Sequence, residues 1–448
     1  MKRPAYAIRT YGCEMNKNDS ERLSGLLESV GLERAVSEDQ ADMIILNTCS
    51  VREHAEQRIM GLMEGYLERH KAGEKLLIAV TGCMAGRDKD GSLRKRLKCV
   101  DLFFATPDMI HLPRWIAELR PDWQIQGDVA EDYLKINPLR NPESRAFVTI
   151  QTGCNQFCTY CVVPYARGLE RNRPLNDILR EVRGLATHGI KEITLLGQTV
   201  NSYTANDPEW FSTTNPYQSH FAALLWELNQ IPGIERIHWT SPHPLKMDDQ
   251  VIHALSLPKQ LNYIHLPVQS GSNEILRRMN RKYTREQYLE IIQKIRSARP
   301  SMAIGTDIIV GFSGETDKDF QDTLDLYTAV DFDICYTAQY SVRSGTLGQR
   351  LFKDDVPSEV KKQRWLAVQE LMEKTTLKKN QVFVGQTLSV LVDHVDGKTL
   401  FGTSSEFKQV RATGAQDDML GKIMPVRINR VMTWQLVGEV VAQQTPVL

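Results

Sequence analysis

The sequence has no excess of charge of either sign and no long apolar run. Its 448 residues contain 55 Lys and Arg against 55 Asp and Glu, so net charge gives no evidence for a nucleic-acid partner. The first residues, MKRPAYAIRTYG, lack the apolar core of a signal peptide, and no later run is long enough to span a bilayer. The hydrophobic content of 42% and the charged content of 25% are ordinary for a globular protein. We therefore expect a cytoplasmic protein with no membrane segment and with room for two or three domains.

Cysteine is also scarce, with 8 residues in the whole chain. In a reducing compartment we expect these residues to be metal ligands rather than disulfide partners. Cys154, Cys158 and Cys161 follow the apolar run 147–151 at C-x3-C-x2-C spacing, which is specific in a chain with so few thiols. Thiolates favour zinc or iron–sulfur clusters. Three of them cannot close a tetrahedral zinc site but leave one iron of a cubane cluster open; a zinc knuckle or a packed cysteine cluster is the alternative.

An α/β pattern fills residues 1–123. Strand-length apolar runs alternate with helix-length stretches, which predicts a parallel sheet with crossover helices. Three of the strands end next to Cys13, Cys49 and Cys83, so these thiols are expected at the carboxyl edge of the sheet, where such sheets bind ligands. They predict a second three-thiolate cluster site, with three buried packing cysteines as the alternative. The expected strands are 5–11, 43–47, 76–81 and 100–105, the expected helices are 18–30 and 51–70, and the polar stretch 124–144 is the expected linker.

Six strands, each followed by a helix, predict an open or partial (β/α)6 barrel over residues 145–382. Active sites of such barrels lie at the carboxyl ends of the strands, and here these ends are polar or contain glycine, as at Gln198, Asn201 and Gln269. Cys99 and Cys335 lie in apolar runs and are expected to be buried packing residues. The expected strands are 147–151, 193–196, 237–240, 263–266, 303–310 and 334–341, and the expected helices are 175–188, 221–228, 250–257, 286–296, 318–329 and 358–379.

Short alternating runs over residues 383–448 predict a small all-β module, with strands at 387–393, 422–429 and 435–441. Contacts to RNA would have to come from individual basic residues of this module, namely Lys408, Arg411, Arg427 and Arg430. Residues 270–300 and 361–380 hold more Lys and Arg than Asp and Glu, so their helices are candidate tracks for RNA phosphates. A solvated helix face is the alternative for each.

The cysteine loop, with Tyr160 before its last thiol, resembles the signature of the radical S-adenosylmethionine (SAM) superfamily. In that superfamily the open iron binds SAM, and an electron from the cluster cleaves SAM to a 5′-deoxyadenosyl radical. The resemblance implies that the central segment is a radical SAM barrel. It also implies that Tyr160, Gln198, Asn201 and Gln269 are cofactor-binding candidates.

Further motifs resemble the methylthiotransferase family over nearly the whole chain, and within it the tRNA-modifying (MiaB-type) branch. They include Tyr11-Gly12-Cys13-Glu14-Met15-Asn16, Asn47-Thr48-Cys49-Ser50-Val51-Arg52-Glu53, Thr81-Gly82-Cys83, Leu195-Leu196-Gly197-Gln198, His265-Leu266-Pro267-Val268-Gln269-Ser270-Gly271-Ser272 and Tyr340-Ser341-Val342-Arg343-Ser344-Gly345-Thr346. The C-terminal module resembles the TRAM domain, an RNA-binding module of these enzymes.

The family resemblance implies two [4Fe-4S] clusters. The cluster on Cys154, Cys158 and Cys161 would generate the radical, and the cluster on Cys13, Cys49 and Cys83 would carry the sulfur. The implied reaction converts N6-isopentenyl-adenosine beside the anticodon of tRNA to its 2-methylthio derivative, by radical C–H activation, sulfur insertion and methyl transfer from SAM. The implied partners are the anticodon stem-loop of tRNA and an electron donor such as a flavodoxin or ferredoxin. No catalytic side chain is expected, because the C2–H bond of adenine offers no proton acidic enough for base catalysis.

Four residues differ from those usual in the family: Leu169, Asn172, Thr199 and Ser313. None is a cysteine ligand, so they bear on substrate preference rather than on the reaction. One alternative function is that of a sibling enzyme acting on threonylcarbamoyl-adenosine or on a ribosomal protein. Another is a non-enzymatic iron–sulfur RNA-binding sensor.

Overall fold

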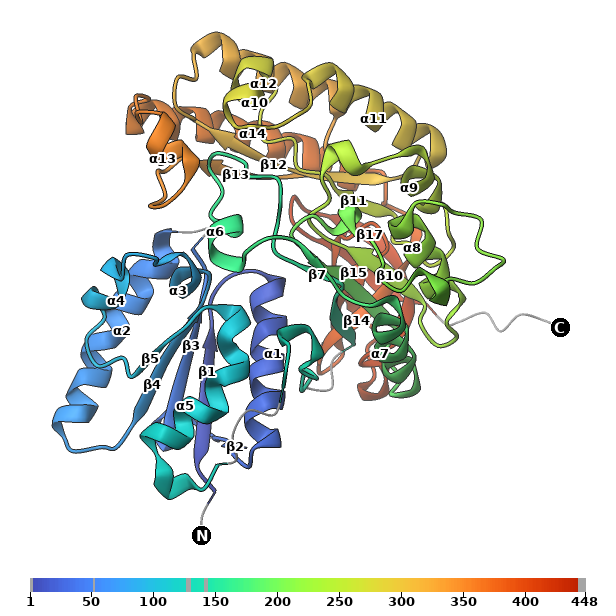
Figure 1. The fold of residues 1–448 in the computed structure, drawn as a ribbon. Helices are drawn as coiled ribbons and strands as arrows, with labels where there is room; N and C mark the ends of the chain where they lie inside the picture. Colours follow the sequence, from blue (N-terminus) through green and yellow to red (C-terminus); the bar gives the residue numbers. More distant parts are fainter. Residues whose placement is uncertain (1–2, 51–52, 126–129, 141–143, 442–448) are drawn as a thin grey trace. The chain divides into compact units, whose positions relative to one another are not determined.

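The computed structural model describes residues 3–50, 53–125, 130–140 and 144–441, and the side chains of residues 53–57 are not described. The chain divides into two compact units (Figure 1). The N-terminal unit comprises Met1–Asn141, Thr152–Arg171 and Arg343–Arg350, and the barrel unit comprises Pro142–Gln151, Asn172–Val342 and Leu351–Leu448. Among the described residues, no helix has the length and apolar character needed to cross a membrane.

The N-terminal unit is built on a five-stranded parallel sheet of order β2-β1-β3-β4-β5. Successive residues of β3 point to opposite faces of the sheet, so Met43 and Ile45 enter one core and Ile44 and Leu46 the other. The helices α1 and α5 cover the first face, and α2 covers the second (Figure 1). The elements are β1 Ala5–Thr10, α1 Glu14–Ser29, β2 Glu33–Arg34, β3 Met43–Thr48, α2 Glu53–Lys71, β4 Leu77–Gly82, α3 Cys83–Arg87, α4 Ser92–Arg96, β5 Leu102–Phe103 and α5 Leu112–Leu119.

The sequence predictions for this unit hold for its main elements. The strands β1, β3 and β4 and the two long helices are confirmed, although residues 51 and 52 of the second expected helix lie outside the described residues. The fourth strand, β5, is only two residues long, and the exposed strand β2 was not predicted. The described part of the expected linker is not a free segment, because Tyr133, Leu134 and Ile136 are buried in the core beside α1.

The barrel unit contains six parallel strands in two sheets of three, ordered β10-β9-β6 and β11-β12-β13. A parallel bridge between Ile237 and Gln260 joins β10 to the segment before β11. The predicted partial (β/α)6 arrangement is therefore confirmed, with a hydrophobic core between strands and helices. The elements are β6 Arg145–Thr149, α7 Leu175–Thr187, β9 Glu192–Leu196, α8 His220–Gln230, β10 Arg236–Trp239, α9 Asp249–Ala254, β11 Tyr263–His265, α10 Asn273–Arg278, α11 Arg285–Ala298, β12 Ala303–Val310, α12 Asp317–Val330, β13 Ile334–Gln339 and α14 Ser358–Gln381.

The predicted all-β module is a closed five-stranded barrel of order β14-β15-β16-β18-β17. Its interior is apolar, with Val390, Leu400, Val410 and Ile428 buried. Within the barrel unit, the ring of Phe407 stacks on the rings of His238 and Tyr263, with ring centroids 4.8 Å apart in both pairs. The strands are β14 Thr387–Asp396, β15 Thr399–Ser404, β16 Gln409–Thr413, β17 Ile423–Val431 and β18 Leu436–Val440, of which β15 and β16 were not predicted.

Candidate functional site

Three cysteines stand at the carboxyl edge of the N-terminal sheet, after three strands that are neighbours. Cys13 precedes α1, Cys49 follows β3, and Cys83 opens α3. In the pairing of the strands, Thr10 lies opposite Asn47 and Thr48 lies opposite Gly82, so all three strands end at the same level. The strand order 2-1-3-4-5 reverses between β1 and β3, and doubly wound sheets bind ligands at that point. The expected convergence of these three residues, the N-terminal triad, is thus what the fold produces.

Two glycines allow this close approach. A Cβ atom on Gly12, whose φ is +130°, would lie 2.7 Å from the Cβ atom of Cys49. A Cβ atom on Gly82, whose φ is +94°, would lie 2.3 Å from the carbonyl oxygen of Thr48. Both distances are far below van der Waals contact, so a larger residue at either position would push the cysteines apart.

The thiols of the N-terminal triad act on one another. Cys49 and Cys83 are buried, whereas Cys13 is exposed. The protein atoms packed around Cys13 still desolvate its thiol and raise its pKa to about 11, and the neighbouring Cys83 and Cys49 thiols raise the pKa further while Arg167 opposes them. The Cys13 residue is therefore open to solvent although protein atoms crowd its thiol. Three such thiols need a positively charged group to become thiolates together.

The second set of cysteines, the loop triad, lies between β7 (Gln151–Thr152) and α6 (Val163–Arg167). Backbone N–H groups donate to its sulfurs: that of Gln156 donates to Cys154 Sγ and that of Val163 to Cys161 Sγ, both at 3.4 Å. Donation of N–H groups to sulfur is one way in which proteins stabilise cluster ligands. Burial raises the pKa of the Cys161 thiol, and the Cys158 and Cys154 thiols raise it further, which shows that the loop gathers its three sulfurs.

The loop triad belongs to the same compact unit as the N-terminal triad, because residues 152–171 group with the N-terminal sheet. The Cys83 thiol contributes to raising the pKa of Cys161, so the two triads act on each other electrostatically. The helices α3 and α6 pack directly, and a Cβ atom on Gly86 would lie 2.1 Å from the carbonyl oxygen of Ala166. All six predicted metal ligands are thus brought into one unit.

The donor set of each triad is three thiolates. Three thiolates leave one iron of a cubane cluster open to a further ligand, so the chemistry of both triads fits a [4Fe-4S] cluster. Among the described residues, no group of three or more His, Cys, Asp or Glu side chains is arranged to hold a single metal ion.

In the barrel unit, the strand ends carry amides rather than thiols. The Gln198 side-chain oxygen is buried and has no hydrogen-bond partner among the described residues. The Asn201 side chain is already engaged, because its Nδ2 donates to the His243 carbonyl oxygen (3.0 Å) and its Oδ1 accepts from the His243 N–H (2.8 Å). Gln269 has a left-handed φ of +73°, an uncommon conformation for a residue with a side chain. Of the predicted SAM-binding amides, Gln198 thus has a buried oxygen without a hydrogen-bond partner among the described residues, whereas Asn201 joins two strand-end loops.

The end of β12 shows that one predicted phosphate track is wrong in part. The Gly311 N–H donates to Glu315 Oε2 at 2.5 Å, and Arg364 Nη1 of α14 donates to the same oxygen at 2.8 Å. Burial raises the pKa of Glu315 to about 7, while the Gly311 N–H and Arg364 oppose the shift. Lys361, also on α14, is buried and donates to Asp354 Oδ1 at 2.6 Å. Arg364 and Lys361 therefore hold the fold together and are not free for RNA phosphates.

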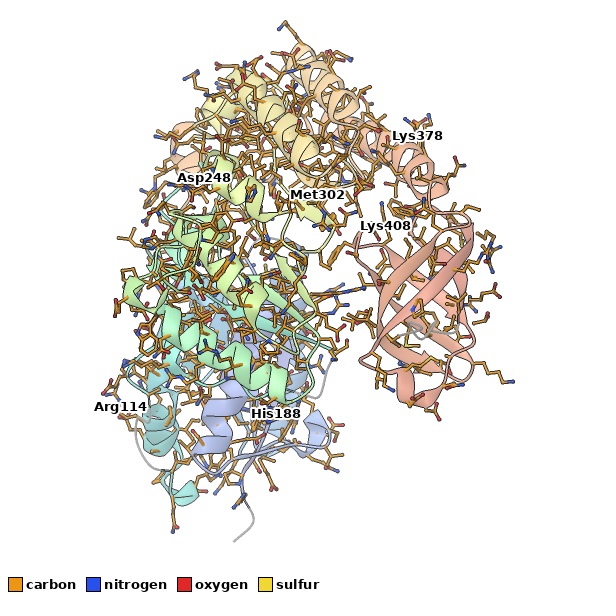
Figure 2. The ribbon with its side chains drawn as sticks, turned by 90° about the vertical axis from the view of Figure 1, so that its right-hand side faces the viewer. Arg114, His188, Asp248, Met302, Lys378 and Lys408 are labelled. Atoms are coloured by element: carbon orange, nitrogen blue, oxygen red, sulfur yellow. The ribbon has the colours of Figure 1, made fainter. Side chains whose placement is uncertain are left out.

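Lys408 and the other predicted track need the same correction. Lys408 (Figure 2) donates to Asp333 Oδ1 at 3.2 Å, and its side chain is 10% exposed. In residues 270–300, Arg281, Arg296 and Arg299 donate to backbone carbonyl oxygens. Composition counted these charges, but it could not show that they face the protein. The remaining candidates of the small barrel, Arg411, Arg427 and Arg430, are exposed.

Sequence reasoning missed a buried polar network beside the N-terminal triad. Arg167 Nη2 donates to Asp19 Oδ2 at 2.5 Å and to Asn16 Oδ1 at 3.1 Å, and Asn16 Oδ1 also accepts from Cys13 Sγ at 3.6 Å. The side chains of Asn16, Asp19 and Arg167 are all buried. The sequence of α1 did contain a signal for this network. Asn16 and Asp19 are polar, lie three positions apart on one side of the helix, and interrupt its apolar side.

The comparisons with known proteins agree with this geometry. Residues 148–327 match the family model "Radical SAM superfamily", and residues 5–105 match "Uncharacterized protein family UPF0004". Two solved structures share the fold. One is the radical SAM methyltransferase TsrM from Kitasatospora setae, with TM-score 0.55, 14% identity, and coverage of 76% of this chain and 75% of that chain. The other is the cobalamin-dependent radical SAM enzyme OxsB, with TM-score 0.52, 14% identity, and coverage of 83% and 56%. The fold and the cysteine loop together define the class, that of the radical SAM proteins.

Curated relatives narrow the class. A protein of Thermoanaerobacter sp. (strain X514) named tRNA-2-methylthio-N(6)-dimethylallyladenosine synthase is 42% identical over 97% of this chain and 92% of its own length. A protein of the same name from Geobacillus kaustophilus is 42% identical over 97% and 82%. The chain belongs to this family of radical SAM methylthiotransferases.

Proposed function

We propose that this protein is a tRNA methylthiotransferase, which converts N6-isopentenyl-adenosine beside the anticodon to its 2-methylthio derivative. The single observation that carries the proposal is the presence of two cysteine triads in one compact unit. A reaction that both activates a C–H bond and inserts sulfur needs a radical source and a sulfur source, and two triads provide a place for each. The identity of about two fifths to the curated synthases, over almost the whole chain, supports the same substrate.

We assign one [4Fe-4S] cluster to Cys154, Cys158 and Cys161, and a second to Cys13, Cys49 and Cys83. When bound, the first cluster and SAM supply the radical, and the second cluster supplies the sulfur. The chain's own residues bind and orient these groups. The N–H groups of Gln156 and Val163 fix the loop sulfurs, while Gly12 and Gly82 allow the strand-end thiols to converge.

We assign SAM binding to Tyr160, Gln198, Asn201 and Gln269. The buried oxygen of Gln198 supports this assignment best, because an acceptor without a partner is costly unless a ligand donates to it, and SAM carries an ammonium group. Asn201 contributes by fixing the loop that follows β10 through its two hydrogen bonds to His243. We assign no side chain as a general base.

We propose that the exposed residues Arg411, Arg427 and Arg430 of the C-terminal barrel contact the phosphates of tRNA. We also propose an electron donor such as a flavodoxin or ferredoxin, and a cytoplasmic location. Binding of an anticodon stem-loop should then weaken as salt concentration rises. Replacement of one of these arginines should lower the salt dependence by about one counterion. Salt-independent binding would contradict the proposal.

Nucleoside analysis of tRNA tests the substrate. Expression of the protein in a strain that lacks its own synthase should restore the methylthio form of isopentenyl-adenosine. An unchanged nucleoside profile would contradict our proposal, and the appearance of methylthio-threonylcarbamoyl-adenosine would identify the sibling enzyme. Absence of SAM cleavage by the reconstituted, reduced protein would instead favour a non-enzymatic sensor.

A further inference from the structure

A buried guanidinium lies beside the N-terminal triad. Arg167 is the last residue of α6, directly after the loop triad, and its side chain is 2% exposed. Burial opposes the charge on Arg167, but the carboxylate of Asp19 keeps its pKa well above the ordinary value. The side chain is therefore a permanent positive charge inside the protein.

Only part of this guanidinium is bound by protein. Its Nη2 donates to Asp19 and to Asn16, as described above. Its Nη1 is buried and has no hydrogen-bond partner among the residues that the structure describes. A charged N–H group that is left unpaired in the interior is unfavourable, so such a group needs a ligand or a water molecule to accept from it.

The guanidinium is held close to the thiols through one shared atom. Asn16 Oδ1 accepts both from Arg167 Nη2 and from Cys13 Sγ. Asn16 is itself fixed, because its Nδ2 donates to the Tyr11 carbonyl oxygen at 3.0 Å and Asn47 Nδ2 donates to its backbone oxygen at 2.8 Å.

The second carboxylate oxygen of Asp19 is also used. It accepts from the hydroxyl of Tyr133, so Asp19 holds Arg167 in place and is not free to bind another cation. Asp19 therefore fixes Nη2 of the guanidinium, while Nη1 has no hydrogen-bond partner among the described residues.

We propose that Arg167 is a positioning residue for anionic sulfur at the N-terminal triad. Its Nη1 donates a hydrogen bond to the sulfur carried there. This inference rests on the proposed function, since it requires a cluster with an open iron on Cys13, Cys49 and Cys83. A guanidinium suits this task, because one nitrogen can keep the Asp19 ion pair while another donates to the ligand. The compact ammonium of a lysine cannot do both in the same geometry.

The test measures hydrosulfide binding by the reconstituted two-cluster protein, through the change in the electron paramagnetic resonance signal of the N-terminal cluster. Arg167→Lys should retain both clusters and the ion pair with Asp19, and should bind hydrosulfide about tenfold more weakly or worse. Its N-terminal cluster should also have a lower reduction potential, with the potential of the loop cluster unchanged.

The control is Arg120→Lys. Arg120 belongs to the same unit, stacks over Trp123 and donates to the Lys75 carbonyl oxygen. The Arg120 variant should leave hydrosulfide affinity and both potentials unchanged. A second variant, Arg167→Gln with Asp19→Asn, removes both charges together and should show the same weakened binding if Arg167→Lys does not fold.

The outcomes separate the inference from the function on which it rests. Wild-type protein that assembles no cluster on the N-terminal triad would overturn both. Wild-type protein that binds hydrosulfide, with equal affinity and potential in the Arg167 variants, would overturn only the role of Arg167. Loss of the N-terminal cluster from both Arg167 variants would show that Arg167 is needed to hold the cysteines in place, and would also overturn the proposal.

Discussion

The carboxyl edges of the parallel sheets carry different chemistry in the two units. In the N-terminal unit, neighbouring strands end in thiols, and the thiol loop of residues 154–161 belongs to the same unit. In the barrel unit, the strand ends carry amides, such as Gln198 and Asn201, and burial keeps the histidine His243 uncharged by lowering its pKa to about 3. The same strand-end geometry thus presents thiols, which we propose as cluster ligands, in one unit and neutral hydrogen-bonding groups in the other. This division predicts that substitutions in the N-terminal unit change cluster chemistry, whereas those in the barrel unit change cofactor affinity or stability.

The largest effect is expected from the cysteines, and it distinguishes the two triads. Cys158→Ala should abolish formation of 5′-deoxyadenosine, because the loop cluster cannot assemble with the open iron that SAM needs. Cys49→Ala should spare 5′-deoxyadenosine formation and remove methylthio product, because its triad carries the sulfur. The measurement is product analysis by mass spectrometry on reconstituted protein.

The two cysteine variants are a matched pair, since both residues are buried in the same unit. Iron content should fall by about one cluster in each variant. If Cys49→Ala also abolished SAM cleavage, the separation of roles between the triads would be wrong.

A smaller but still severe effect is expected at Gly12. Gly12→Ala places a Cβ atom 2.7 Å from that of Cys49, so the N-terminal cluster should be lost or bound weakly. Gly31→Ala is the control: its φ is +96°, also left-handed, but its Cβ atom would have no neighbour within 4 Å. Both variants carry backbone strain of about 1–3 kcal/mol. They differ in the crowding of Cys49 and of the Asn16 side chain, which occurs in Gly12→Ala and not in Gly31→Ala.

Iron content and the spectrum of the N-terminal cluster measure this difference. Gly31→Ala should keep two clusters with a modest loss of thermal stability. Equal loss of cluster in both variants would show that strain, not close approach, limits the site.

Much of this arrangement could be predicted from the sequence, because the informative patterns are local. Each of three apolar strands ends within three residues of a cysteine, and parallel strands must bring such residues to one edge. The strand β2 could not be predicted, because its two residues are exposed and carry no apolar pattern. The same limit applies to β15, where Gly402 interrupts the alternation; a Cβ atom there would lie 2.1 Å from the Leu391 carbonyl oxygen.

Ion pairs between residues far apart in the chain could not be predicted from the sequence. Arg167 and Asp19 are 148 positions apart, and nothing in either segment indicates that they form a buried pair. For α14, composition correctly showed a basic helix but could not show that Arg364 faces Glu315 across 49 positions. Charge counts describe a segment, whereas function depends on the direction in which each charge faces.

A moderate effect is expected at Gln198 in the barrel unit. Gln198→Met keeps the size of the side chain but removes the buried acceptor oxygen, so SAM should bind about tenfold more weakly, with both clusters intact. Equilibrium dialysis with SAM under anaerobic conditions measures the affinity. Gln230→Met, an exposed position on α8, is the control and should bind SAM normally. Normal SAM binding by Gln198→Met would remove this residue from the cofactor site.

The smallest effect concerns His238, a buried histidine of the barrel unit. Burial lowers its pKa from 6.5 to about 3, with Arg145 and His265 adding to the shift, so the folded protein keeps it neutral. Below pH 6.5 the unfolded chain binds a proton at this residue and the folded chain does not, so its contribution to stability is present above pH 6.5 and is lost as pH falls towards 3.

The contribution of His238 to the free energy of unfolding should fall by roughly 1.4 kcal/mol for each pH unit below 6.5. His238→Gln should be less stable at pH 7.5, because the stack on Phe407 is lost, yet its melting temperature should fall less between pH 6.5 and 5.5 than that of wild type. His188→Gln, which changes an exposed histidine (Figure 2), should keep the wild-type slope. Part of the slope should survive in His238→Gln, because the pKa of His243 is lowered by burial in the same way. Wild type, His238→Gln and His188→Gln could instead lose stability equally on acidification. The buried histidines of the barrel unit would then not be the groups that resist protonation. The contrast with the thiols of the N-terminal unit would rest on the amides alone.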